Sequence, residues 1–122
     1  MAATSDSGHA PSYYAATAVG MEAHPPLKGS ASADVCVIGG GFTGLSAALH
    51  LAERGHDVVL IEGRRLGWGA TGRNGGQIHS GQRRDQDYLE RVAGMEAAQA
   101  LWAFGEEAKS LIRERVKRHG ID

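Results

Sequence analysis

Two short apolar runs flank a segment of helical periodicity in the first half of the chain. Residues 35–38 and 58–61 are continuously apolar, a pattern typical of parallel strands buried on both faces. Between them, over residues 42–54, apolar side chains recur at helical spacing: Leu45, Ala48, Leu49 and Ala52. Gly55 follows where a left-handed cap would end a helix. The pattern predicts a strand–helix–strand unit whose first strand is central in a parallel sheet.

The last third of the chain has a helical pattern. Asp87 with Glu90 resembles an N-terminal capping box, and Gly94 predicts a bend or a break, so either two helices or one kinked helix should follow. An apolar stripe continues towards Gly120, which marks a stop. The stripe comprises Leu101, Phe104, Ala108, Leu111 and Ile112. These positions indicate a helix face that packs on a partner surface.

Residues 1–33 differ in composition from the rest. They are rich in Ala, Ser, Gly and Thr and show little periodicity, which predicts a partly disordered N-terminal arm. Tyr13 and Tyr14 within this arm suggest an aromatic anchor that packs on the body of the protein. Residues 34–122 are then interpreted as the N-terminal part of a larger domain.

The net charge and the cysteine and histidine content argue against several classes of function. A formal net charge of −1 over 122 residues gives no reason to expect nucleic acid or a membrane surface as a partner. Cys36 is the single cysteine, and its place in an apolar run predicts a buried, inert thiol, which fits a reducing compartment. No apolar run is as long as a membrane-spanning helix and the N-terminus lacks the features of a secretory signal, so we expect a cytoplasmic protein. The six histidines show no metal-ligand spacing, and no serine or cysteine stands in a nucleophile motif. The sequence therefore predicts no metal site and identifies no catalytic residue.

The turn between the first strand and the helix carries the strongest motif. Gly39, Gly41 and Gly44 have the G-x-G-x-x-G spacing of dinucleotide-binding folds. Gly39 would permit the tight turn, Gly41 would let the backbone approach a pyrophosphate, and Gly44 would let the helix pack closely on the strand. The N–H groups at the helix start would then face an anion.

Glu62 stands at the end of the second strand. A carboxylate there can accept hydrogen bonds from both ribose hydroxyls of adenosine, so Glu62 is the leading candidate for a ligand contact. The alternative interpretation is a solvated acid at a strand end. The succession of strand, glycines, helix, cap, strand and acid favours ligand binding.

A cationic, glycine-rich loop follows. Residues 63–84 hold no Asp or Glu and five arginines: Arg64, Arg65, Arg73, Arg83 and Arg84. Thr71 and Asn74 add short polar side chains, and successive glycines can turn their N–H groups inward as an anion-binding nest. A flexible surface loop with solvated arginines is the alternative.

Residues 35–77 resemble the N-terminal flavin-binding segment of FAD-dependent amine oxidoreductases related to D-amino acid oxidase and glycine oxidase. Residues 67–77, together with 12–17, resemble more specifically the gamma-glutamylputrescine oxidase group, which oxidises a primary amine in putrescine breakdown. The resemblance extends weakly through the terminal helix to residues 119–122.

The resemblance implies FAD as the cofactor and a small amine as the substrate of the full-length enzyme. Some relatives attach the flavin to a histidine in the comparable loop, but Arg73 stands at about that place, which implies noncovalent FAD. The mechanism implied is hydride transfer to flavin N5, imine hydrolysis and reoxidation by oxygen to peroxide. The implied cofactor-binding residues are Gly39, Gly41, Phe42, Thr43, Gly44, Glu62, Gly63, Arg64, Ala70, Thr71, Gly72, Arg73, Asn74, Gly75 and Gly76.

The predicted fold class is α/β, with a partial Rossmann-like FAD/NAD(P)-binding βαβ unit, a glycine-rich loop and a C-terminal helix or helix pair. A chain of this length lacks room for a substrate domain, so we expect an incomplete domain that is inactive alone. Two alternatives stay open: a fragment of an NAD-dependent dehydrogenase, and a non-catalytic, truncated nucleotide-binding module. The oligomeric state is left undetermined.

Overall fold

The computed structural model describes residues 11–20 and 24–121 and divides into two compact units, Met1–Gly75 and Gly76–Asp122. The first unit contains α1 (Tyr13–Thr17), β1 (Val35–Ile38), α2 (Phe42–Glu53), β2 (Val58–Ile61) and the short 3-10 helix η1 (Ala70–Gly72). The second unit contains α3 (Gln86–Ala93) and α4 (Met95–His119).

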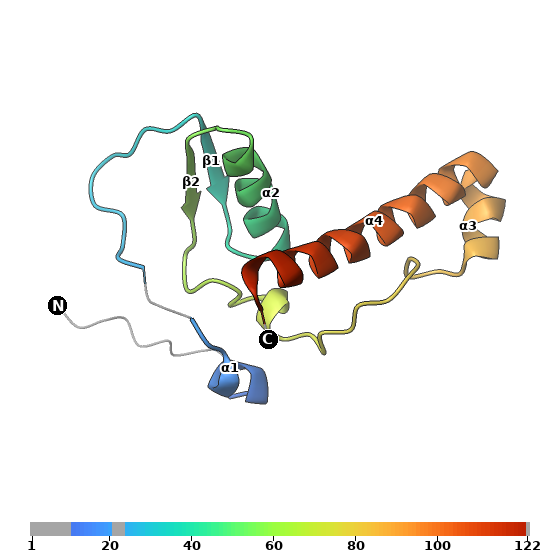
Figure 1. The fold of residues 1–122 in the computed structure, drawn as a ribbon, viewed down its shortest axis with the longest axis horizontal. Helices are drawn as coiled ribbons and strands as arrows, with labels where there is room; N and C mark the ends of the chain where they lie inside the picture. The colour runs from blue at the N-terminus through green and yellow to red at the C-terminus, as the bar shows by residue number, and fades with distance from the viewer. Residues whose placement is uncertain (1–10, 21–23, 122) are drawn as a thin grey trace. The chain divides into compact units, whose positions relative to one another are not determined.

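The strand–helix–strand prediction for the first unit is confirmed. β1 and β2 are parallel and in register from Val35 opposite Val58 to Ile38 opposite Ile61, and α2 lies against the sheet (Figure 1). Gly55, at a φ of +88°, follows the last turn of α2, as its sequence position indicated. The crossover therefore brings the ends of both strands to the same edge of the sheet.

The prediction that β1 is central and buried on both faces is wrong for the described residues. β1 pairs with β2 in a two-stranded sheet, and its residues alternate between half-buried and exposed. Cys36 is exposed rather than buried, and Ile38 is 86% exposed. The cause is the alternation of side chains along a strand: α2 covers one face, and Cys36 and Ile38 point away from it.

The N-terminal arm is described in part, since residues 1–10 and 21–23 of the predicted arm lie outside the described residues. Ser12 caps α1 by accepting a hydrogen bond of 3.2 Å from the Ala15 N–H. The rings of Tyr13 and Tyr14 meet edge to face with centroids 6.0 Å apart. They are 76% and 52% exposed, so the predicted packing of these rings on the body is not found.

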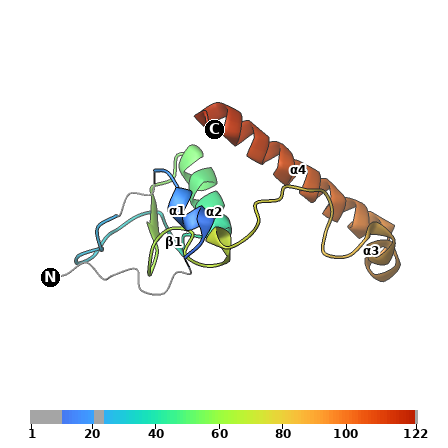
Figure 2. The ribbon, with the colours of Figure 1, turned by 90° about the horizontal axis from the view of Figure 1, so that it is seen from below.

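The second unit is a helix pair preceded by an extended segment. Gly94, at a φ of +85°, separates the two helices, so the helical pattern is broken rather than kinked there. α3 folds back against the first turns of α4, which continues as one rod (Figures 1 and 2). Gly120 ends α4 in the left-handed conformation, as predicted. In the described part of the chain, no helix combines the length and hydropathy that a membrane-spanning segment requires.

The N-cap of α3 is Asp85, and the prediction of a capping box at Asp87 is wrong. Asp85 has extended backbone dihedrals, and its Oδ1 accepts the Tyr88 N–H at 3.1 Å. Asp87 lies within the first turn, where its charge favours the positive end of the helix dipole. Two aspartates stand near the start of α3, and the residue composition alone does not distinguish them. The backbone conformation decides which one is the N-cap, because an N-cap residue has extended dihedrals.

Replacing Asp85 by alanine should therefore destabilise α3 more than the same change at Asp87. Loss of the cap costs about 1 kcal/mol, whereas loss of a first-turn charge costs a few tenths. Hydrogen exchange measured by mass spectrometry on peptides from α3 provides the test. Equal exchange in the D85A and D87A variants would contradict the assignment.

Candidate functional site

The glycine turn joins β1 to α2 through three closely constrained positions. Gly39 has a φ of +104°, which favours glycine, and its N–H donates to the Ile61 carbonyl at 2.8 Å. A Cβ at Gly44 would lie 1.9 Å from the Gly39 carbonyl oxygen and 3.4 Å from Val37 Cγ1. The predicted roles of Gly39 in the turn and of Gly44 in close helix packing are thus confirmed.

Glu62 lies at the end of β2 and binds the glycine turn directly. Its Oε2 accepts the Gly40 N–H at 2.7 Å, and its Oε1 accepts the Arg64 N–H at 2.9 Å. These backbone donors, Gly40 first, stabilise the ionised carboxylate and hold the pKa of Glu62 below its usual value. Each carboxylate oxygen keeps a further lone pair with which it could accept a ligand hydroxyl.

Gly40 and Leu66 belong to this arrangement and were not identified from the sequence. A Cβ at Gly40 would lie 2.4 Å from Leu66 Cδ2 and 3.3 Å from Glu62 Oε2, so a larger residue there would require the Leu66 side chain to move. The Gly40 carbonyl also accepts the Gly67 N–H at 2.8 Å. The sequence offered one indication of the role of Gly40: it is the middle residue of a run of three glycines, and the G-x-G-x-x-G spacing requires only the first and the third.

The loop after Glu62 returns to the start of α2. Thr71 Oγ1 accepts the Phe42 N–H at 3.0 Å. The side-chain amide of Asn74 donates to the carbonyls of Ala70, at 3.3 Å, and Thr71, at 2.7 Å. These hydrogen bonds fold the loop into a turn and connect it to the start of α2.

Trp68 organises two of the loop arginines, a role that the sequence did not indicate. The guanidinium groups of Arg64 and Arg73 lie 4.3 and 4.7 Å from the centroid of the Trp68 ring. Arg73 Nε also donates to the Trp68 carbonyl at 3.1 Å. Cation–π contacts of this kind hold two positive charges in fixed places within the predicted site.

The N-terminus of α2 presents backbone donors suited to an anion. The first hydrogen bond of the helical ladder runs from the Leu45 N–H to the Gly41 carbonyl at 2.9 Å. The N–H groups of Phe42, Thr43 and Gly44 precede this ladder, and Thr71 binds that of Phe42. The N–H groups of Thr43 and Gly44 point out of the helix end, where the dipole favours negative charge. This donor set fits a pyrophosphate.

Three segments of the first unit thus come together: the glycine turn, the end of β2 and the following loop. They contain most of the predicted site residues, namely Gly39, Gly41, Phe42, Thr43, Gly44, Glu62, Gly63, Arg64, Ala70, Thr71, Gly72, Arg73, Asn74 and Gly75. Gly76, the remaining predicted residue, begins the second unit and has a φ of +71°.

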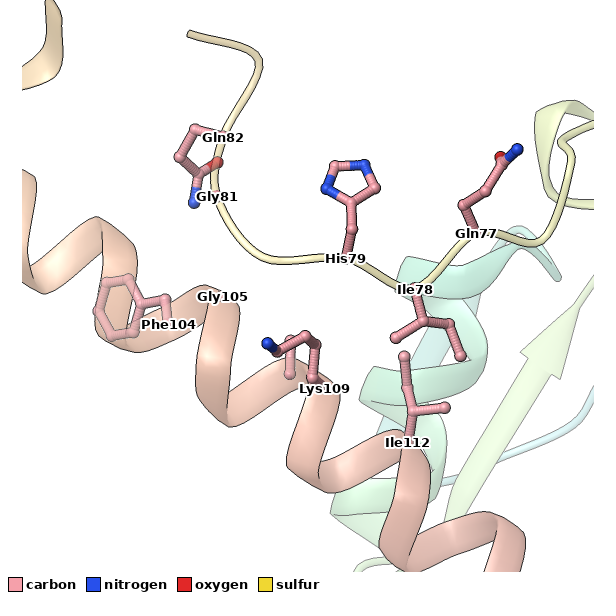
Figure 3. A pocket seen from close by; sticks show the side chains of 10 residues that line it. Gln77, Ile78, His79, Gly81, Gln82, Phe104, Gly105, Lys109 and Ile112 are labelled. Carbon is pink, nitrogen blue, oxygen red and sulfur yellow. The ribbon is translucent and has the colours of Figure 1, made fainter. Parts of the chain in front are cut away.

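The second unit holds a hollow between loop 77–82 and α4 (Figure 3). Lys109, with a side chain 14% exposed, donates to the Ser80 hydroxyl and lies 2.9 Å from a carboxylate oxygen of Glu106. The hydrogen bond from Lys109 lowers the pKa of Glu106. Apolar lining comes from Ile78, Phe104, Ala108 and Ile112. These contacts fasten the loop to the helix. The described residues contain no cluster of three potential metal ligands.

Several bacterial oxidoreductases are similar to this chain. It is 51% identical over 114 residues to gamma-glutamylputrescine oxidoreductase of Escherichia coli (strain K12), covering 93% of this chain and 27% of that protein. It is 48% identical over 111 residues to the probable oxidoreductase OrdL of Rhizobium meliloti (strain 1021), covering 91% and 26%. One subunit of the anaerobic glycerol-3-phosphate dehydrogenase of Escherichia coli (strain K12) is 50% identical over 95 residues, covering 78% and 16%.

The chain thus spans about a quarter of the length of the first two relatives. No solved structure matches it at a significant level. The family model of the FAD dependent oxidoreductases (DAO) matches residues 34–122, which include the glycine turn, Glu62, the Thr71 loop and both C-terminal helices. The chain therefore belongs to the family of FAD-dependent oxidoreductases.

Proposed function

We propose that the chain is the N-terminal FAD-binding segment of an amine oxidoreductase that acts on gamma-glutamylputrescine or a similar primary amine. The observation that carries the proposal is the 51% identity to gamma-glutamylputrescine oxidoreductase over 93% of the chain. The sequence resemblance of residues 67–77 supports the same group. Dependence of the family on FAD favours flavin over the nicotinamide alternative.

The arrangement of the first unit suggests how the cofactor would be held. Gly39, Gly41 and Gly44 would lie next to the pyrophosphate, whose charge suits the N–H groups at the start of α2. Glu62 would accept the adenosine ribose hydroxyls, because its two backbone donors keep the carboxylate ionised and oriented. Residues 70–76 would run beside the pyrophosphate and the flavin ring.

Bound FAD would supply flavin N5 as the acceptor of a hydride from the carbon that bears the amine, and oxygen would reoxidise the reduced flavin and be released as peroxide. The residues of this chain would bind the FAD and orient it. Arg73 stands at about the place where some relatives carry a flavin-linked histidine, so we expect the flavin to be bound noncovalently. The Arg73 guanidinium contacts Trp68. The amine site and the catalytic groups would lie in the rest of the protein, so this chain alone is inactive.

The presence of a single cysteine is consistent with a protein of the reducing cytoplasm.

A second candidate function comes from the similarity to an anaerobic glycerol-3-phosphate dehydrogenase subunit, 50% identical over 95 residues. The same cofactor-binding segment would then serve an enzyme that oxidises a phosphorylated alcohol. The shorter coverage, 78% of the chain against 93%, favours the amine.

The complete protein should purify with yellow flavin absorbance, and acid denaturation should release all of the flavin because no covalent bond holds it. Anaerobic addition of gamma-glutamylputrescine should bleach the flavin spectrum, whereas glycerol 3-phosphate should leave it unchanged. Bleaching by glycerol 3-phosphate alone would support the second candidate. Protein that stays colourless after incubation with FAD would favour a non-catalytic module.

A further inference from the structure

We propose that Thr71 is a positioning residue for FAD: its hydroxyl caps α2 in place of the absent side chain of Gly41 and fastens the second cofactor loop to the first. The inference rests on the proposed FAD-binding function and adds a role for one hydrogen bond within that site. The bond joins Phe42 and Thr71, residues that are far apart in the sequence.

The N-cap of α2 is unusual. Gly41 occupies the cap position with extended dihedrals, φ −91° and ψ −175°, and can provide no side-chain acceptor. A serine or aspartate at an N-cap normally binds the N–H of the second or third helical residue, here Thr43 or Gly44. Such a cap would occupy the donors that a pyrophosphate needs. Thr71 instead accepts the first N–H, that of Phe42, and leaves the next two for the ligand.

Gly41 provides the space that this cap requires. A Cβ at Gly41 would lie 3.1 Å from Thr71 Oγ1, a separation tighter than most real contacts of a Cβ atom. The absence of a side chain at Gly41 therefore serves the Thr71 hydroxyl as well as the approach of a ligand.

The loop holds Thr71 independently of the helix. Asn74 donates to the Thr71 carbonyl at 2.7 Å, and the Arg73 N–H donates to the Ala70 carbonyl at 3.1 Å within η1. The hydroxyl is therefore presented by a turn that is already folded. A loop fixed before the cofactor arrives loses less conformational freedom on binding, which raises affinity.

Thr71→Val in the complete protein tests the proposal, because valine has the same shape but cannot accept the bond. FAD titration of the apoprotein, followed by flavin fluorescence, should show binding weakened roughly fivefold to tenfold, and Thr71→Ser should restore it. Ser46→Ala removes an exposed hydroxyl from the same helix and should bind FAD as the wild type does.

Hydrogen exchange of the FAD-free protein provides the second readout. Peptides covering the start of α2 should exchange faster in T71V and in Gly41→Ala than in the wild type or T71S. Weakened FAD binding without faster exchange would overturn the capping role and leave Thr71 as a direct ligand. Unchanged affinity and exchange would overturn the proposal altogether. A wild type that binds no FAD would refute the proposed function, while the exchange comparison would still decide whether Thr71 caps α2.

Discussion

Replacing Gly44 by alanine is expected to weaken FAD binding by the complete protein strongly. The new Cβ would lie 1.9 Å from the Gly39 carbonyl oxygen and 3.1 Å from its carbon, which are backbone atoms that cannot rotate away. The start of α2 must then move from β1 by about 1 Å. This displacement would carry the N–H groups of Thr43 and Gly44 away from the site. We expect affinity for FAD to fall by roughly a hundredfold or more.

Gly105→Ala is the matched control, because Gly105 is also a glycine inside a helix. A Cβ there would meet the Gly81 nitrogen at 3.7 Å, an ordinary van der Waals separation. Alanine favours the helix by up to about 1 kcal/mol, so G105A should be neutral or stabilising. The measurements are FAD titration and far-ultraviolet circular dichroism of both variants. If G44A bound FAD with wild-type affinity, α2 and β1 would not be in the close contact described.

The elements of the first unit could be predicted because local signals mark their ends. The apolar runs 35–38 and 58–61 correspond to β1 and β2, and Gly55 adopts the positive φ that its position required. The exposure of Cys36 could not be predicted in the same way. A continuous apolar run indicates that both faces of a strand can be buried. Whether a face is buried in the folded protein depends on which other segments cover it.

The candidate site was predictable in its outline and not in its internal contacts. The spacing of the glycines and the acid at Glu62 follow from the requirements of a known motif. The contact of Leu66 with Gly40, and the cap that Thr71 provides, join residues distant in the chain, so no local pattern indicates them. Trp68 was missed because an aromatic residue in a loop has no distinctive spacing.

Glu62→Gln should weaken FAD binding by roughly tenfold to a hundredfold, the range expected when hydrogen bonds to a charged group are lost. The carboxylate accepts the N–H groups of Gly40, at 2.7 Å, and Arg64, at 2.9 Å, one on each oxygen. Glutamine can accept only one of them, because its amide nitrogen is a donor and would face the other N–H. One of the two N–H groups that bind Glu62 would lose its acceptor, and the site would lose an acceptor for the ribose.

The pH dependence of FAD binding gives the same residue a second test. Because the pKa of Glu62 is lowered in the folded protein, its ionised form stabilises the site at all pH values above the ordinary carboxyl range. This contribution is lost only as the pH falls through the lowered pKa, so FAD should still be bound where an ordinary glutamate becomes protonated, and it should be released only at more acidic pH. Fluorescence titrations from neutral to acid pH should show this loss in the wild type, and a shallower one in E62Q, which has no proton to bind there. Glu107→Gln, an exposed change on α4, should match the wild type throughout. Wild-type affinity in E62Q at neutral pH would refute the role of the carboxylate, because the variant lacks the charge that both N–H groups and the ribose are expected to use.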